Sequence, residues 1–146
     1  MSPITPSQQL RFEPVGRHLI HLDGDTIFLI VRGPLTRPDV QELFAAFRRV
    51  QVEYGRLFIF YDAREAGGIE ADARRYAATV PTTIQEADLQ VVFGLSFGLR
   101  TVLNMVLRAQ RLLHNRTANF HLFDTEENAR VFFEAERERM RLEKKR

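Results

Sequence analysis

The 146-residue sequence contains no cysteine and no tryptophan. Without cysteine the chain cannot form disulfides, zinc–thiolate sites or a thiol nucleophile. It has no apolar run of membrane-spanning length, and its polar, proline-bearing start lacks the apolar centre of a signal peptide. We therefore expect a cytoplasmic protein.

A strong excess of charge is also missing. The net charge is +2, well short of the clustered basic excess that is typical of nucleic-acid binding. Both glycine-rich nucleotide fingerprints, G-x-x-x-x-G-K-S/T and G-x-G-x-x-G, are absent. We expect neither a nucleic-acid partner nor a bound cofactor.

The sequence does contain a regular alternation of apolar runs and helical patterns. HLIHL and TIFLIVRG, joined by the turn DGD, predict a β-hairpin. A helix follows, with Thr36 as its N-cap and Gly55 as its stop. Further strands are expected at 57–61, 88–93 and 120–123, and further helices at 69–79, at 99–114 and after an Asp124 cap. The order ββαβαβαβα predicts an α/β fold with a mostly parallel sheet and helices on both faces.

The same patterns set the expected boundaries. We expect a flexible arm over 1–16, one domain over 17–135 and a charged helical tail over 136–146 that extends into solvent. The double glycine Gly67–Gly68 predicts a turn between the strand at 57–61 and the next helix.

Three stretches relate the chain to a known family. VRGPLTRPDVQELFAAF, LFIFYDAREAGG and FHLFDTEENARVFF resemble the STAS-domain superfamily, and most closely the SpoIIAA-like family of stand-alone bacterial domains. The resemblance covers roughly 17–135 and implies a non-catalytic regulatory module that acts through protein contacts, as a homodimer. Better-known members carry a phosphorylated serine after the third strand. The matching stretch AREAGGIEA has no hydroxyl, so this switch does not carry over.

The SpoIIAA-like resemblance also implies an alternative function, the carriage of a nonpolar or lipid-like ligand with contact to membrane surfaces. The helix at 99–114 is apolar over a wide arc, and its polar ridge bears Arg100, Arg108 and Arg111, which could meet lipid phosphates or an acidic partner. Met105, Leu107 and Leu112 lie outside its core stripe and are candidates for a dimer interface or a ligand pocket. A solvated arginine face is the simpler interpretation.

Several residues follow the ends of expected parallel strands. Asp62, Ser96 and Asp124 should meet at one edge of the sheet, where ligands of open α/β sheets bind. With Gly67 and Gly68 they form a candidate crevice; the alternative is that they are caps and turn residues. Glu65 and Glu70 would repel a phosphate at the glycines. No metal site is expected, because further ligands at suitable spacing are lacking.

The motif GLSFG at 94–98 matches the G-x-S-x-G turn of serine hydrolases, with Ser96 as the nucleophile. Those enzymes place the acid before the histidine, whereas Asp124 follows both His114 and His121 here. A hydrolase is the third hypothesis. We favour a cap role for Ser96 and a protein that is not an enzyme.

Overall fold

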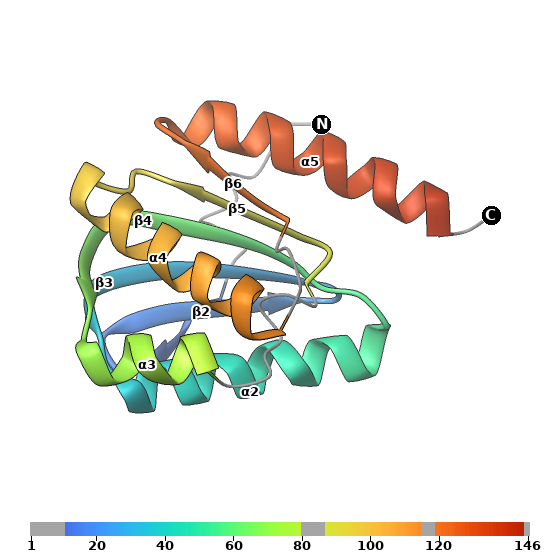
Figure 1. The fold of residues 1–146 in the computed structure, drawn as a ribbon. Helices are drawn as coiled ribbons and strands as arrows, with labels where there is room; N and C mark the ends of the chain where they lie inside the picture. The colour runs from blue at the N-terminus through green and yellow to red at the C-terminus, as the bar shows by residue number, and fades with distance from the viewer. Residues whose placement is uncertain (1–10, 80–86, 115–118, 145–146) are drawn as a thin grey trace.

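A six-stranded mixed sheet forms the centre of the computed structural model, which describes residues 11–79, 87–114 and 119–144 (Figure 1). The strands lie side by side in chain order: β1 (Glu13–Val15), β2 (His18–Asp23), β3 (Thr26–Leu35), β4 (Phe58–Ile69), β5 (Leu89–Phe93) and β6 (Phe120–Phe123). The first three pair antiparallel, and the pairs from β3 to β6 are parallel. The α/β class with an opening hairpin is thus confirmed. β1 lies within the region expected to be an irregular arm, so the observed order has one more strand.

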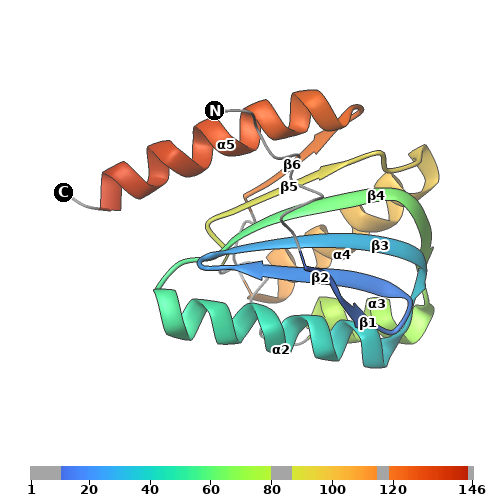
Figure 2. The same ribbon diagram turned by 180° about the vertical axis from the view of Figure 1, so that it is seen from behind.

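The helices cover the sheet unequally. They are α2 (Arg37–Tyr54), α3 (Ala71–Thr79), α4 (Phe97–His114) and α5 (Glu126–Lys144). Figures 1 and 2 show α2, α3 and α4 together on one face and α5 on the other side, next to β5 and β6. Alternation along the strands divides the core accordingly. Ile27 and Leu29 pack toward α2, whereas Phe28 and Phe60 pack toward Phe133 of α5.

The caps of α2 follow the sequence prediction. The Thr36 hydroxyl accepts a hydrogen bond from the Asp39 N–H, and the Asp39 carboxylate accepts one from the Thr36 N–H, which completes a capping box. Gly55 has φ 72° and ends the helix in the left-handed conformation.

The histidines of β2 lie on opposite faces of the sheet, as their spacing predicted. His18 is fully buried; its Nδ1 accepts from the Arg32 N–H, so its Nε2 donates to Asp39 at 3.2 Å. His21 contacts Phe28 on the other face. His18 therefore ties the first strands to the start of α2.

The turn expected at the double glycine is wrong, because β4 continues through Gly67 and Gly68 to Ile69. β3 extends to Leu35 and pairs with this segment through two irregularities in register. A Cβ on Gly67 would lie 2.8 Å from the backbone of Gly33 and Pro34. The glycine is thus needed for a close approach of two strands, which the sequence pattern did not distinguish from a break.

Two predictions at the C-terminal helix also need correction. The N-cap of α5 is Thr125, whose hydroxyl accepts from the Asn128 N–H, and not Asp124. Residues 136–144, expected to extend into solvent, continue α5, and Met140 of this part packs against the core. There, Arg141 makes a bidentate contact with the buried carboxylate of Asp25 in the β2–β3 turn, at 2.5 and 3.1 Å.

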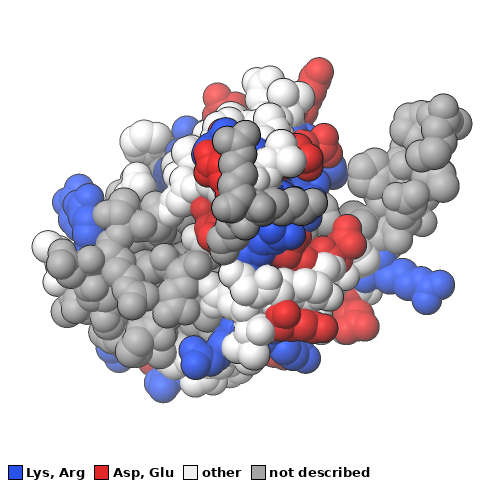
Figure 3. Space-filling view, turned by 90° about the vertical axis from the view of Figure 1, so that its right-hand side faces the viewer, with Lys and Arg blue, Asp and Glu red and all other residues white. Residues whose placement is uncertain are grey.

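Asp25 is the centre of a charge cluster that the sequence did not reveal. Its side chain is 5% exposed and also accepts from Arg56 at 2.6 Å and from the Thr26 hydroxyl at 2.9 Å. Arg141 lies over the Phe58 ring, so the arginine joins the charge cluster to the core. Figure 3, which views the molecule from the right-hand side of Figure 1, shows acidic and basic side chains interspersed on this face.

Candidate functional site

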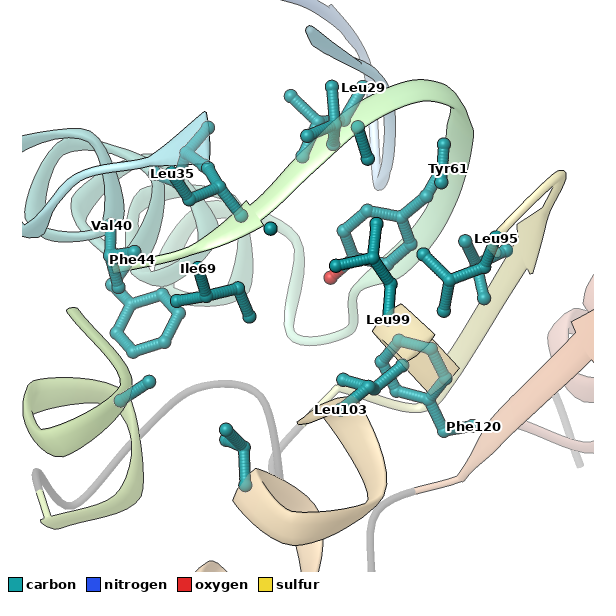
Figure 4. Close-up of a pocket in the computed structure, with 18 of the residues that line it drawn as sticks. Leu29, Leu35, Val40, Phe44, Tyr61, Ile69, Leu95, Leu99, Leu103 and Phe120 are labelled. Atoms are coloured by element: carbon teal, nitrogen blue, oxygen red, sulfur yellow. The ribbon is translucent and has the colours of Figure 1, made fainter. Parts of the chain in front are cut away.

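An apolar pocket lies between the sheet and the layer formed by α2, α3 and α4. Its volume is about 130 Å³. Strand residues such as Leu29 line it from the sheet, Phe44 from α2, and Leu99 and Leu103 from α4 (Figure 4). Val92 of β5 and Val106 of α4 also line it. The pocket is thus located beneath α4, the helix with the wide apolar arc.

The space arises from small side chains on β4. Strand alternation directs Tyr61 and Ala63 toward the helices, because Phe60 packs against α5. Ala63, Ala66 and Gly68 line the pocket where larger side chains would fill it. A Cβ on Gly68 would reach to 3.5 Å from Leu99, so α4 lies close above this part of β4.

Tyr61 brings a polar group into this hydrocarbon surrounding. Its hydroxyl donates a hydrogen bond of 2.5 Å to Oε1 of Gln90, a fully buried residue of β5. Its ring stacks on Phe120, with ring centroids 5.6 Å apart and an interplanar angle of 21°. Burial raises the pKa of the Tyr61 phenol, so the hydroxyl stays protonated at neutral pH. Among the described lining residues, Tyr61 is the one with a polar side chain.

This composition sets what the pocket can hold. A buried water needs two to four polar partners, roughly, and the described lining side chains offer one hydroxyl. None of them carries a charge at neutral pH, so a charged group inside would be desolvated without a counter-ion. The pocket therefore favours a neutral, nonpolar occupant.

The outer face of α4 carries exposed apolar side chains. Phe97 is 86% exposed, Met105 61% and Leu112 76%. Leu107, grouped with Met105 and Leu112 in the sequence prediction, is half-buried. Phe97 was missed because the helix begins two residues before the expected start. Phe97, Met105 and Leu112 are called the α4 outer face below.

The arginines predicted for lipid or anion contact differ in their surroundings. Arg108 and Arg111 are exposed. Arg100 instead forms an ion pair with Asp124 and donates to the Leu95 carbonyl, which joins the start of α4 to the end of β6.

The residues of the predicted crevice have different partners. Gly68 lines the apolar pocket. Asp62 faces the α5 side, where it pairs with Arg64, which approaches Glu126 at 3.7 Å. Gly67 lies against β3, and Asp124 pairs with Arg100 in a loop. Among these five residues, Gly68 is the one that lines the apolar pocket, and a shared crevice stays a prediction.

Ser96 has the geometry of a helix cap. Its hydroxyl accepts from the Leu99 N–H at 3.3 Å, and its carbonyl accepts from the Arg100 N–H. His121 is turned toward α5, where it contacts Phe132 and pairs with Asn119. The side chain of His114 lies outside the described residues. In the described part of the chain, no three histidine or acidic side chains gather as metal ligands.

Comparisons with known proteins concern the fold. No protein-family model matches the chain, and the search of curated proteins found no significant match. The chain is similar to the crystal structure of an uncharacterized protein from the DUF3478 family with a SpoIIAA-like fold from Shewanella loihica PV-4. The TM-score is 0.49 and the identity 14%, over 78% of this chain and 89% of that chain.

A second solved structure is the anti-sigma factor antagonist SpoIIAA in its unphosphorylated form. The TM-score is 0.48 and the identity 13%, over 82% of this chain and 93% of that chain. Within the described residues, no helix is long and apolar enough to span a membrane.

Proposed function

We propose that the protein is a non-catalytic binding module that holds a small nonpolar group in the pocket beneath α4. The observation that carries this proposal is the hydrocarbon lining, which Tyr61 alone interrupts among the described side chains. A cavity of about 150 Å³ with Leu, Ile and Phe walls stays dry and binds benzene. A pocket of about 130 Å³ therefore suits one aromatic ring or a short branched alkyl group.

The energetics favour an occupant. The pocket walls are hydrocarbon, and apolar surface that an occupant removes from water contributes about 25 cal/mol per Å². A nonpolar group that fills the space restores dispersion contacts with the walls and leaves water. This gain is the driving force that we assign to ligand binding.

Toluene tests the proposal through the melting temperature. At a free concentration of about ten times its Kd, a ligand that binds only the native state adds about 1.4 kcal/mol to the free energy of unfolding. For a domain of this size the melting temperature should rise by roughly 3–6 °C. Val106→Phe places a larger side chain from α4 in the pocket, and Ala77→Leu places one there from α3. Each variant should abolish the rise in melting temperature that toluene causes.

Matched controls place the same changes on the surface. Val52→Phe and Ala45→Leu alter exposed positions of α2 and should keep the toluene response. A wild-type protein that ignores toluene, or filled variants that respond like the wild type, would contradict a binding pocket.

A second candidate function is a STAS-like regulatory module whose partner docks on the α4 outer face. The three exposed apolar side chains of that face support it, since isolated exposed side chains of this size are common but a row along one helix favours an interaction site. The sequence of α4 has no acidic residue, and Arg108 and Arg111 flank the face. Charge complementarity therefore favours an acidic protein partner.

A photocrosslinking amino acid at Met105 tests this second function. It should trap one discrete protein in the native host, and Arg108→Glu with Arg111→Glu should abolish the product. Arg48→Glu with Arg49→Glu, at exposed positions of α2, is the matched control. Self-crosslinking would assign the face to a homodimer instead, and sedimentation with anionic vesicles would assign it to a membrane surface.

A further inference from the structure

We propose that the pocket selects nonpolar molecules that carry one hydrogen-bond donor, such as a hydroxyl group or an indole N–H, and that the Tyr61 oxygen accepts this hydrogen bond. The inference rests on the proposed ligand-binding function and adds the chemical class of the ligand.

The direction of the Tyr61 hydrogen bond is the first step. A phenol has one O–H to donate and an oxygen that can also accept. The Tyr61 hydrogen is given to Oε1 of Gln90, at 2.5 Å. What remains available on Tyr61 is acceptor capacity, so the residue complements a donor on the ligand.

The position of the oxygen is the second step. Figure 4 shows the Tyr61 oxygen directed into the middle of the pocket, among Ile69, Leu99 and Leu103. The stacked Phe120 ring and the bond to Gln90 hold the tyrosine from two sides. A fixed acceptor in a hydrocarbon wall provides directional selectivity, because the ligand polar group has one place to bind.

The rest of the lining excludes other ligand classes. The described side chains around Tyr61 are hydrocarbon, so a carboxylate or ammonium group would have no counter-charge. A second polar group on the ligand would also be left without a partner there. The favoured ligand therefore has one ring or branched alkyl body and one neutral donor.

Three probes of similar size test this class: toluene has no polar group, phenol has a donor, and anisole has an acceptor oxygen without a donor. Affinities are measured by titration followed through methyl NMR signals of the intact chain. In the wild type, phenol should bind at least as tightly as toluene. In Tyr61→Phe, the ratio of phenol affinity to toluene affinity should fall by about tenfold. The hydroxyl of the bound phenol probe would then be buried without the Tyr61 oxygen that accepts its hydrogen bond. The ratio of anisole affinity to toluene affinity should not fall.

The outcomes separate the two levels of the proposal. If none of the probes binds the wild type, the proposed function fails. If toluene binds but Tyr61→Phe leaves the phenol ratio unchanged, the donor-selective class is wrong. A fall of the anisole ratio equal to that of phenol would also overturn it, because Tyr61 would then donate to the ligand.

A second variant keeps the test valid if Tyr61→Phe is poorly folded. Gln90→Met removes the acceptor of the Tyr61 hydrogen, which becomes free to donate toward the pocket. The affinity for anisole, relative to toluene, should then rise by about threefold to tenfold. An unchanged anisole ratio in this variant would contradict the assigned direction of the hydrogen bond.

Discussion

Replacing Asp25 by asparagine tests whether the charge cluster at the β2–β3 turn fastens α5 to the sheet. The variant keeps the size of the side chain and removes the charge that Arg56 and Arg141 share. Breaking a fully buried ion pair costs about 3–5 kcal/mol. The Arg56 and Arg141 side chains are 26% and 30% exposed, so water can still solvate them after the carboxylate is removed, which lowers the cost.

We therefore expect Asp25→Asn to lower the free energy of unfolding by about 2–3 kcal/mol, below the range for a fully buried pair. For a domain of this size, the melting temperature should fall by roughly 5–10 °C. Urea denaturation followed by circular dichroism measures the loss. Asp23→Asn removes an exposed acid at the end of β2, next to this turn, and should stay within about 0.5 kcal/mol of the wild type.

The pH dependence supplies an independent check. Burial raises the pKa of Asp25, but hydrogen bonds from Arg141, Thr26 and Arg56 outweigh it, and the net pKa lies below the ordinary value of 3.8. A lowered folded-state pKa means that the contribution is complete above 3.8 and is lost as the pH falls through the folded-state value. The difference between wild type and Asp25→Asn should shrink only in that acid range. Equal losses of unfolding free energy for Asp25→Asn and Asp23→Asn would contradict a specific role of the Asp25 charge cluster in holding α5 to the sheet.

Three further predictions concern the corrected and the predicted site residues. Gly67→Ala should cost about 1–3 kcal/mol in urea denaturation, because its Cβ would meet the β3 backbone, whereas Gly98→Ala meets open space; equal costs would contradict the close approach. Thr125→Ala should cost about 1 kcal/mol by the same assay and Asp124→Ala less than about 0.5 kcal/mol, since Asp124 is 84% exposed; the reverse order would restore Asp124 as the cap. A fluorophosphonate probe should leave Ser96 unlabelled in mass spectra, and labelling that Ser96→Ala abolishes would reveal a nucleophile.

The order of the elements from β2 onward could be predicted because it depends on local signals. The side chains of Thr36 and Asp39 accept hydrogen bonds from each other's backbone N–H at the start of α2, and Gly55 ends the helix in the left-handed conformation. The double glycine was misread because glycine marks both a turn and a close approach of strands. The backbone of Gly33 and Pro34, which decides between the two, is distant in sequence.

The pocket depended on tertiary structure in the same way. A helical wheel indicated excess apolar surface on the helix at 99–114, but the space beneath it depends on small residues of β4, such as Ala63 and Ala66. Tyr61 could have been noticed as a phenol inside an apolar strand, although its partner Gln90 is on the next strand. Likewise, Asp25 and Arg141 form an ion pair although 116 positions separate them in the sequence.

Methyl NMR of the wild-type protein, titrated with toluene, tests the nonpolar pocket most directly because it locates the ligand. We expect saturable shifts of the methyl groups of Leu99, Leu103 and Val106, which line the pocket. The methyl groups of Val131 and Leu142, exposed on α5, should stay unchanged. Shifts confined to exposed methyl groups, or no saturable shift at all, would contradict the claim that this space binds a nonpolar group.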